Sequence, residues 1–255
     1  MAGPPFTGVG VAIVTLFDGD GRLDAASTAG LAVELVDAGV SAVVVAGSTG
    51  EAAALDLDER SGLLRAVRAV LPSVPVIAGT GAPSTRQAVL YTERAVTDGA
   101  DAVLVLSPPG VTDPRSYYEA VVRRSGSVPV LAYHYPGVSS PGIALDVLRQ
   151  LPVAGCKDSS GDAQRLLQTL TSWDQPLYTG SSAVLSFAGP LGCAGAILAL
   201  ANAEPELCIA AFGGDAGAQL SLAQSHFAAQ GSFPGGIKAL TARRFGTSTA
   251  RRMGG

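Results

Sequence analysis

The sequence is poor in the residues on which several common kinds of site depend. Its three cysteines, Cys156, Cys193 and Cys208, are odd in number and lack CxxC spacing, which argues against a disulfide framework and against a zinc site. His134 and His226 are the only histidines, so we expect no metal site. The N-terminus lacks the basic and apolar regions of an export signal, and the free cysteines suit a reducing compartment. We therefore expect a cytoplasmic protein.

Charge is also scarce, because only 15% of the residues are charged and the formal net charge is -4. Basic residues occur in runs no longer than a pair, which argues against a nucleic-acid partner. Apolar runs fall short of the ~20 residues that a membrane-spanning helix needs. We expect neither nucleic acid nor membrane as a partner.

Short apolar runs alternate with amphipathic segments along the chain. The runs show little polar alternation, which is typical of parallel strands covered on both faces. Eight strands are predicted, at Val9–Val14, Ala42–Ala46, Pro75–Gly79, Ala102–Leu106, Pro129–Tyr133, Val153–Lys157, Pro176–Gly180 and Gly195–Leu200. Helices are predicted between them, at Asp24–Ala38, Asp56–Leu71, Ser84–Asp98, Pro114–Arg124, Ile143–Leu151 and Gly161–Thr171. Eight even repeats without a G-x-G-x-x-G motif favour an α/β fold of the (β/α)8 TIM-barrel type over an open sheet.

The barrel is expected to occupy residues 1–203. Residues 204–255 then form a short C-terminal helical extension that packs on the barrel within the same domain. Its predicted helices are Glu204–Phe212, Asp215–Gln230 and Gly235–Arg244. The last residues, Gly246–Gly255, are expected to be a frayed tail.

Lys157 stands at the end of an apolar strand, where this fold gathers its catalytic groups. The chain has only two lysines, Lys157 and Lys238, among its 17 basic residues. An amine can lose its proton and attack a carbonyl, which a guanidinium cannot. A lysine whose head group extends from the strand end to solvent is the alternative interpretation.

Two further motifs stand at the ends of predicted strands, Tyr133 on the strand next to that of Lys157 and a glycine-containing loop directly after the second strand. Tyr133 is the fifth residue from Pro129, as Lys157 is from Val153, so the two side chains are predicted to lie at similar height, where a phenol beside an amine could transfer protons. An aromatic residue at the barrel rim is the simpler alternative. The loop Gly47-Ser48-Thr49-Gly50-Glu51 presents backbone N–H groups suited to a carboxylate, although it also fits a helix capping box.

Taken together, the motifs GSTGE, YHYP and GCKDSSGD resemble those of the dihydrodipicolinate synthase and N-acetylneuraminate lyase family, in order and spacing over nearly the whole chain. The resemblance implies a class I aldolase or lyase with Lys157 as the Schiff-base lysine and Tyr133 as the proton-transferring phenol. It implies a carboxylate-binding loop at Gly47, Ser48 and Thr49, in which the Ser48 hydroxyl also joins the proton relay. Gly180 and Ile197 fall where relatives line the pocket.

The same resemblance implies pyruvate-type 2-oxo acid and aldehyde substrates, no metal or organic cofactor, and a homo-oligomer, either a tetramer or a dimer. Two departures bear on the substrate. Val138 replaces an arginine that grips a second carboxylate in the synthases, so the chain is expected to be closer to aldolases of 2-keto-3-deoxy sugar acids. The strand-four loop, Ser107–Val111, lacks the tyrosines of many relatives.

Other activities stay open on the sequence alone. The chain could be a dehydratase acting on a related 2-keto-3-deoxy acid, or a catalytically weakened member that only binds a 2-oxo acid. A phosphate-handling barrel isomerase and a metal-dependent aldolase are less favoured. The sequence fixes neither the substrate nor the direction of the reaction.

Overall fold

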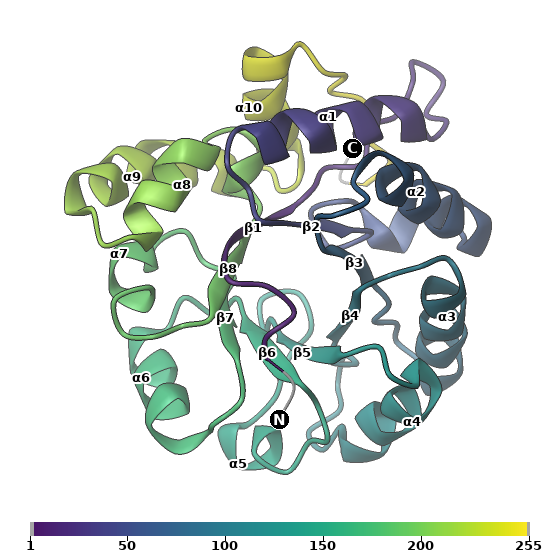
Figure 1. Cartoon of the computed structure of the whole chain (residues 1–255), viewed down its shortest axis with the longest axis vertical. Coiled ribbons are helices and arrows are strands. Elements are labelled where there is room, and N and C mark those ends of the chain that lie inside the picture. The colour runs from purple at the N-terminus through teal and green to yellow at the C-terminus, as the bar shows by residue number, and fades with distance from the viewer. Residues whose placement is uncertain (1–2, 254–255) are drawn as a thin grey trace.

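The structure is a computed structural model that describes residues 3–253, apart from the side chain of Gln230. Eight parallel strands close into a barrel in sequence order, with β8 pairing back to β1 (Figure 1). The strands are β1 Gly8–Ala12, β2 Ala42–Val45, β3 Val76–Gly79, β4 Ala102–Leu106, β5 Val130–His134, β6 Gly155–Asp158, β7 Leu177–Thr179 and β8 Gly195–Leu198. The predicted TIM barrel is confirmed.

Helices form a ring around the barrel, as Figure 1 shows. They are α1 Ala25–Asp37, α2 Leu57–Val70, α3 Thr85–Thr97, α4 Arg115–Ser125, α5 Leu145–Leu148, α6 Ala163–Ser172 and α7 Leu185–Ala188. The side chain of Asp24 caps α1, and Asp56 with Glu59 forms a capping box at α2, which supplies partners for backbone N–H groups that a helix start leaves free. The sequence pattern indicated no helix at Leu185–Ala188, because four residues are too few to show helical periodicity.

The C-terminal part consists of three helices, α8 Pro205–Phe212, α9 Ala216–Gln230 and α10 Gly235–Phe245. α8 packs against α9 and against β1. Short 3-10 turns, η1 Ala52–Ala54 and η2 Leu200–Asn202, follow the second and eighth strands. The Asn202 side chain accepts from Val14 N–H and donates to Ala12 C=O, which joins the end of the last strand to the first. The domain division at residue 203 stays a prediction.

The buried apolar residues form two layers. One layer fills the barrel interior and includes Val44, Ile77, Leu104, Leu131 and Ile197, whereas a larger layer lies between strands and helices. At the amino end of the strands, Phe6 stacks on Tyr178 with ring centroids 4.7 Å apart, and the Tyr178 hydroxyl donates to Phe6 C=O. This aromatic pair lies opposite the carboxyl end of the barrel, where this fold gathers its catalytic groups.

The expected fraying of the tail is wrong for residues 246–253. The backbone N–H groups of Arg252 and Met253 both donate to the Glu51 carboxylate, and the Arg252 guanidinium binds Glu59. These contacts join positions about 200 residues apart, which local sequence patterns do not reveal. Residues 254–255 lie outside the described part of the chain.

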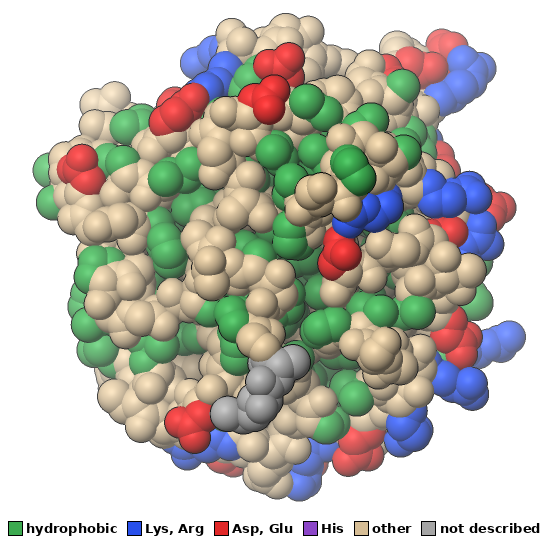
Figure 2. All heavy atoms as spheres, in the orientation of Figure 1, with side chains coloured by type: hydrophobic (Ala, Val, Ile, Leu, Met, Phe, Trp, Pro, Cys, Tyr) green, Lys and Arg blue, Asp and Glu red, His purple; other side chains and the backbone are tan. Residues whose placement is uncertain are grey.

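Charged side chains lie mainly around the margin of the face shown in Figure 2, where acidic and basic groups are mixed. Within the described residues, no helix has the length and apolar character needed to cross a membrane.

Candidate active site

Lys157 projects from β6 into the carboxyl end of the barrel. The register pairs Tyr133 on β5 with Lys157 on β6, so the predicted equal height of the two residues is confirmed. The Lys157 ammonium nitrogen lies 4.2 Å from the centroid of the Tyr133 ring. Burial of this amine lowers its pKa to about 7, because the charged form loses its hydration. A substantial fraction of the amine is thus unprotonated and nucleophilic near neutral pH.

Gly180, directly after β7, leaves the space through which the lysine side chain passes. A Cβ placed on this glycine would lie 2.7 Å from Lys157 Cε and would also collide with the Ser159 hydroxyl. Gly180 itself belongs to the lining of the cavity around Lys157. The residue therefore acts on the site through shape, as any larger side chain would displace the amine.

The Tyr133 hydroxyl is joined to two serine hydroxyls. Ser159 donates to it at 3.4 Å, and it forms a hydrogen bond with the Ser48 side chain. Burial raises the pKa of Tyr133 to about 12, although both hydrogen bonds act in the opposite direction. The phenol is accordingly protonated at neutral pH and is placed to exchange a proton with Ser48 or Ser159.

The loop that carries Ser48 and Thr49 has a constrained backbone. Ala46 and Glu51, which flank it, have φ of 51° and 54°, values that non-glycine residues seldom adopt. The Thr15 hydroxyl donates to Gly50 C=O at 2.6 Å, and a Cβ on Gly50 would lie 2.9 Å from Ile13 C=O, directly after β1. Such strain persists only where surrounding contacts fix the backbone, and it gathers at functional sites.

A cavity of about 480 Å³ opens above Lys157. Its lining is rich in hydroxyl groups from β5 and from the loops after β2, β5, β6 and β7, and α9 adds a histidine. The hydroxyl and histidine residues of the lining are Thr49, Tyr133, Tyr135, Ser159, Ser160, Ser181, Ser182 and His226. The Ser182 hydroxyl and His226 Nδ1 are 2.8 Å apart. Lys157 is the one Lys or Arg side chain among the described residues of this lining.

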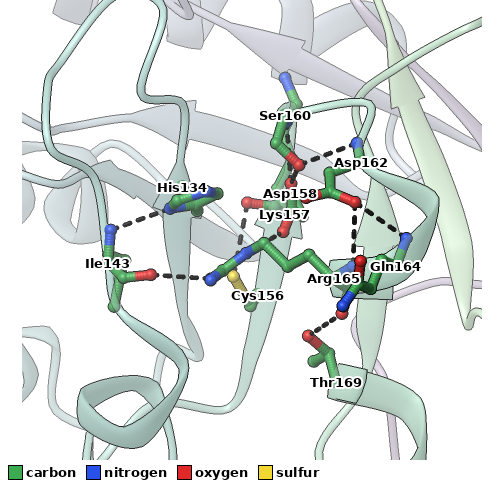
Figure 3. A network of polar contacts seen from close by, with 10 residues as sticks. All are labelled: His134, Ile143, Cys156, Lys157, Asp158, Ser160, Asp162, Gln164, Arg165 and Thr169. Atoms are coloured by element: carbon green, nitrogen blue, oxygen red, sulfur yellow. Dashed lines mark hydrogen bonds and ion pairs between the residues drawn. The ribbon is translucent and has the colours of Figure 1, made fainter. Parts of the chain in front are cut away.

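Below the lysine, the end of β6 is anchored by a polar network that Figure 3 displays. The Asp158 carboxylate pairs with Arg165 Nε at 2.7 Å, and the Arg165 guanidinium also donates to Ile143 C=O. Ile143 N–H donates to Nδ1 of His134 at 2.8 Å, so this histidine faces the helix layer. The network keeps Asp158 turned away from the amine and fixes the strand from which Lys157 extends.

The structure places the other residues named from the sequence elsewhere. Ile197 lies in the barrel interior and Gly47 C=O accepts from Ala52 N–H, and neither is part of the described cavity lining. Val138 is 51% exposed, so it offers no substitute for a guanidinium. Tyr117 and Tyr118, the tyrosines that follow the strand-four loop, lie on α4, and their hydroxyls bind backbone groups of residues 82 and 105.

Comparison with known proteins decides the family. The sequence model described as the Dihydrodipicolinate synthetase family matches residues 5–226. This chain belongs to that family.

Individual relatives and solved structures support the same family assignment. A protein described as an uncharacterized DapA-like lyase from Halobacterium salinarum is 39% identical over 79% of this chain and 69% of its own length. A 4-hydroxy-tetrahydrodipicolinate synthase from Pseudomonas aeruginosa is 36% identical over 82% of this chain and 76% of its own. The dihydrodipicolinate synthase of Acinetobacter baumannii in complex with pyruvate superimposes with a TM-score of 0.91 at 27% identity, over 97% of this chain and 92% of that one.

A prophage protein of the family from E. coli K12, also in complex with pyruvate, gives a TM-score of 0.91 at 26% identity, over 98% of this chain and 92% of that one. The Dihydrodipicolinate synthetase family consists of class I, Schiff-base-forming lyases, and this chain is one of them.

Within this family site, several lining residues were missed by sequence reasoning. Tyr135 stacks on Tyr133 with ring centroids 5.8 Å apart and borders the cavity, so it supplies a second phenol from the same chain. Alternation along the strand would have indicated it, because Tyr133 and Tyr135 share a face. His226 carried no such signal, since its position depends on how α9 packs over the barrel.

The lysine's depressed pKa predicts the pH dependence of the lyase. Below a pH of about 7 the amine is protonated and cannot attack, so kcat/KM for a 2-oxo acid should fall about tenfold per pH unit there and level off above it. Steady-state rates between pH 5.5 and 9 measure this profile. A profile that still rises steeply from pH 8 to pH 9 would show that the amine keeps an ordinary lysine pKa.

Proposed function

We propose that Lys157 forms a Schiff base with the C2 carbonyl of a 2-oxo acid and that the enzyme cleaves or forms the C3–C4 bond of a 2-keto-3-deoxy sugar acid. The observation that carries the proposal is a buried amine with a pKa of about 7, beside Tyr133, at the base of a hydroxyl-lined cavity. The loop with Ser48 and Thr49 would bind the C1 carboxylate through its backbone N–H groups.

In the cleavage direction, the neutral Lys157 amine attacks C2, and the resulting carbinolamine takes up a proton and loses water, which gives an iminium ion. The C4 hydroxyl then gives its proton to the Tyr133 oxygen while the protonated phenol releases its own proton through Ser48. The C3–C4 bond breaks and its electron pair moves into the iminium, so that an aldehyde and an enamine result. Protonation of the enamine at C3 and hydrolysis of the imine release pyruvate and restore the amine. Ser48 and Ser159, both bonded to Tyr133, would pass protons to and from the phenol.

The lining supports a neutral, hydroxylated distal end for the substrate. Serine hydroxyls and His226 can bind sugar hydroxyl groups as donors and acceptors. A second carboxylate would need a bidentate partner such as arginine, and the described lining residues include none. The position where synthases carry that arginine is the exposed Val138.

A substrate comparison tests this assignment. With pyruvate as the common donor, kcat/KM for condensation should be at least about tenfold higher with glyceraldehyde than with aspartate semialdehyde, because the latter brings an unpaired carboxylate into the cavity. Cleavage of 2-keto-3-deoxygluconate, followed as released pyruvate, should proceed with the same enzyme. Preference for aspartate semialdehyde would contradict the sugar-acid assignment, and a dehydrated product without pyruvate release would identify a dehydratase.

A further inference from the structure

The end of the C-terminal segment 247–253 is hydrogen-bonded to Glu51, the last residue of the loop that carries Ser48 and Thr49. The Glu51 carboxylate is completely buried. One of its oxygens, Oε2, accepts from the N–H groups of Arg252 and Met253, each at 2.7 Å. The other, Oε1, lies 2.5 Å from the ammonium nitrogen of Lys238 on α10.

Lys238 ties the same segment to the loop from a second side. Its side chain is also completely buried, and its ammonium group donates to Ala250 C=O at 2.6 Å. A buried ion pair is weak evidence for added stability, since desolvation of both charges offsets their attraction, but removal of one partner leaves the other charge unpaired. The ion pair therefore fixes the positions of Glu51 and of the C-terminal segment more than it stabilises the fold.

Arg252 extends the connection to α2. Its guanidinium makes two hydrogen bonds of 2.7 Å with the Glu59 carboxylate and donates to Gly21 C=O and Ala54 C=O. It also lies 4.5 Å from the ring centroid of the buried Phe17. These four hydrogen bonds of the guanidinium fix the position of Arg252, whose backbone N–H donates to Glu51.

The backbone of Glu51 closes the turn that contains Ser48. Glu51 N–H donates to Ser48 C=O at 3.2 Å, while its φ of 54° is a conformation that a glutamate does not favour. A strained conformation of this kind persists only if other contacts hold it, and the side-chain contacts of Glu51 are those with Lys238 and the tail. If the carboxylate were released, the turn would be free to relax, and Ser48 and Thr49 would move with it.

We infer that Glu51 is a positioning residue for the carboxylate-binding loop, and that the C-terminal segment, through Arg252 and Met253, holds Glu51 in place. The inference rests on the proposed function, in which Ser48 and Thr49 bind the C1 carboxylate of the 2-oxo acid. Its consequence is that the last residues of the chain affect how tightly the 2-oxo acid binds, although they do not touch it.

The test compares Arg252→Ala with Arg251→Ala, a matched loss of charge at the exposed neighbouring position, and with a chain that ends at Gly246. Half-saturation by pyruvate is measured as borohydride trapping of the imine, alongside KM, kcat and the melting temperature. Arg252→Ala and the shortened chain should raise the half-saturation concentration about tenfold at a kcat changed less than about threefold, because loss of positioning weakens ground-state binding. Arg251→Ala should match the parent protein.

A purely structural role would lower the melting temperature and leave half-saturation unchanged at a temperature where the variant is folded, and this outcome overturns the inference. If the shortened chain does not fold, Arg252→Ala decides alone, since it keeps the backbone donors and loses only the guanidinium contacts. Absence of any imine in the parent protein would instead refute the proposed function, so the two failures are distinguishable.

Discussion

Replacing Lys157 with methionine is expected to abolish turnover and to stabilise the folded protein. The amine is buried, its ammonium nitrogen makes no hydrogen bond or ion pair with any described residue, and desolvation is what lowers its pKa to about 7. Methionine fills a similar volume without a charge to desolvate. The expected gain is on the order of 3 kcal/mol at pH 7, which is roughly 5–10 °C in melting temperature for a domain of this size.

The gain should depend on pH in a defined direction. The folded-state pKa of Lys157 lies below its unfolded value of about 10.5, so the unfolded chain binds more protons between about pH 7 and pH 10. The parent protein is therefore most penalised at or below pH 7, and the penalty shrinks as the pH rises. The difference in melting temperature between Lys157→Met and the parent should be largest near pH 6 and smallest near pH 10.

Lys238→Met is the matched control, since it changes the other lysine in the same way. It leaves the Glu51 carboxylate buried without its ion-pair partner, so it should destabilise the protein by about 3–5 kcal/mol. Opposite signs for the two lysines would support a catalytic amine at 157 and a structural one at 238. A Lys157→Met variant that melts below the parent at pH 6 would contradict this account.

Tyr133→Phe is expected to lower kcat by about 10²–10³ while pyruvate still forms an imine at Lys157, because the phenol carries protons during bond cleavage and the amine supplies the electrophile. The two steps are separable, since borohydride trapping reports imine formation and pyruvate release reports turnover. The hydroxyl that this change removes is the one bonded to Ser48 and Ser159.

Tyr135→Phe serves as the control for Tyr133→Phe, because it deletes the neighbouring phenol hydroxyl and keeps the stacked ring. We expect a smaller effect, of about tenfold or less. If Tyr133→Phe retained more than a third of the parent kcat, the proton relay through Tyr133 would have to be abandoned. If both changes were equally severe, the two phenols would act together.

The features that the sequence predicted are those with a local signal. Strands covered on both faces appear as continuous apolar runs, and equal counts from the strand starts placed Tyr133 beside Lys157, as the register confirms. The caps at Asp24 and Asp56 also have a local signal, because a cap depends on residues three positions apart.

The features that the sequence did not predict depend on contacts between distant segments. Fraying of the tail is expected because chain termini are often poorly ordered, yet its backbone and Arg252 bind residues of the second βα unit about 200 positions earlier. His226 reaches the cavity only through the packing of α9, and Glu51 had been interpreted as part of a capping box, whereas its carboxylate turns to Lys238. Such pairings are set by tertiary structure and have no periodic pattern.

The central claim is that Lys157 is the residue that forms an imine with the 2-oxo acid. The most direct measurement is reduction of the protein by borohydride in the presence of pyruvate, followed by peptide mass spectrometry, with Lys157→Arg as the control. The account predicts one reduced pyruvyl adduct per chain, on Lys157, and none in the variant; Lys238 should stay unmodified because it is buried against Glu51. No adduct, or an adduct that persists on Lys238 or the N-terminus when Lys157 is replaced, would contradict it.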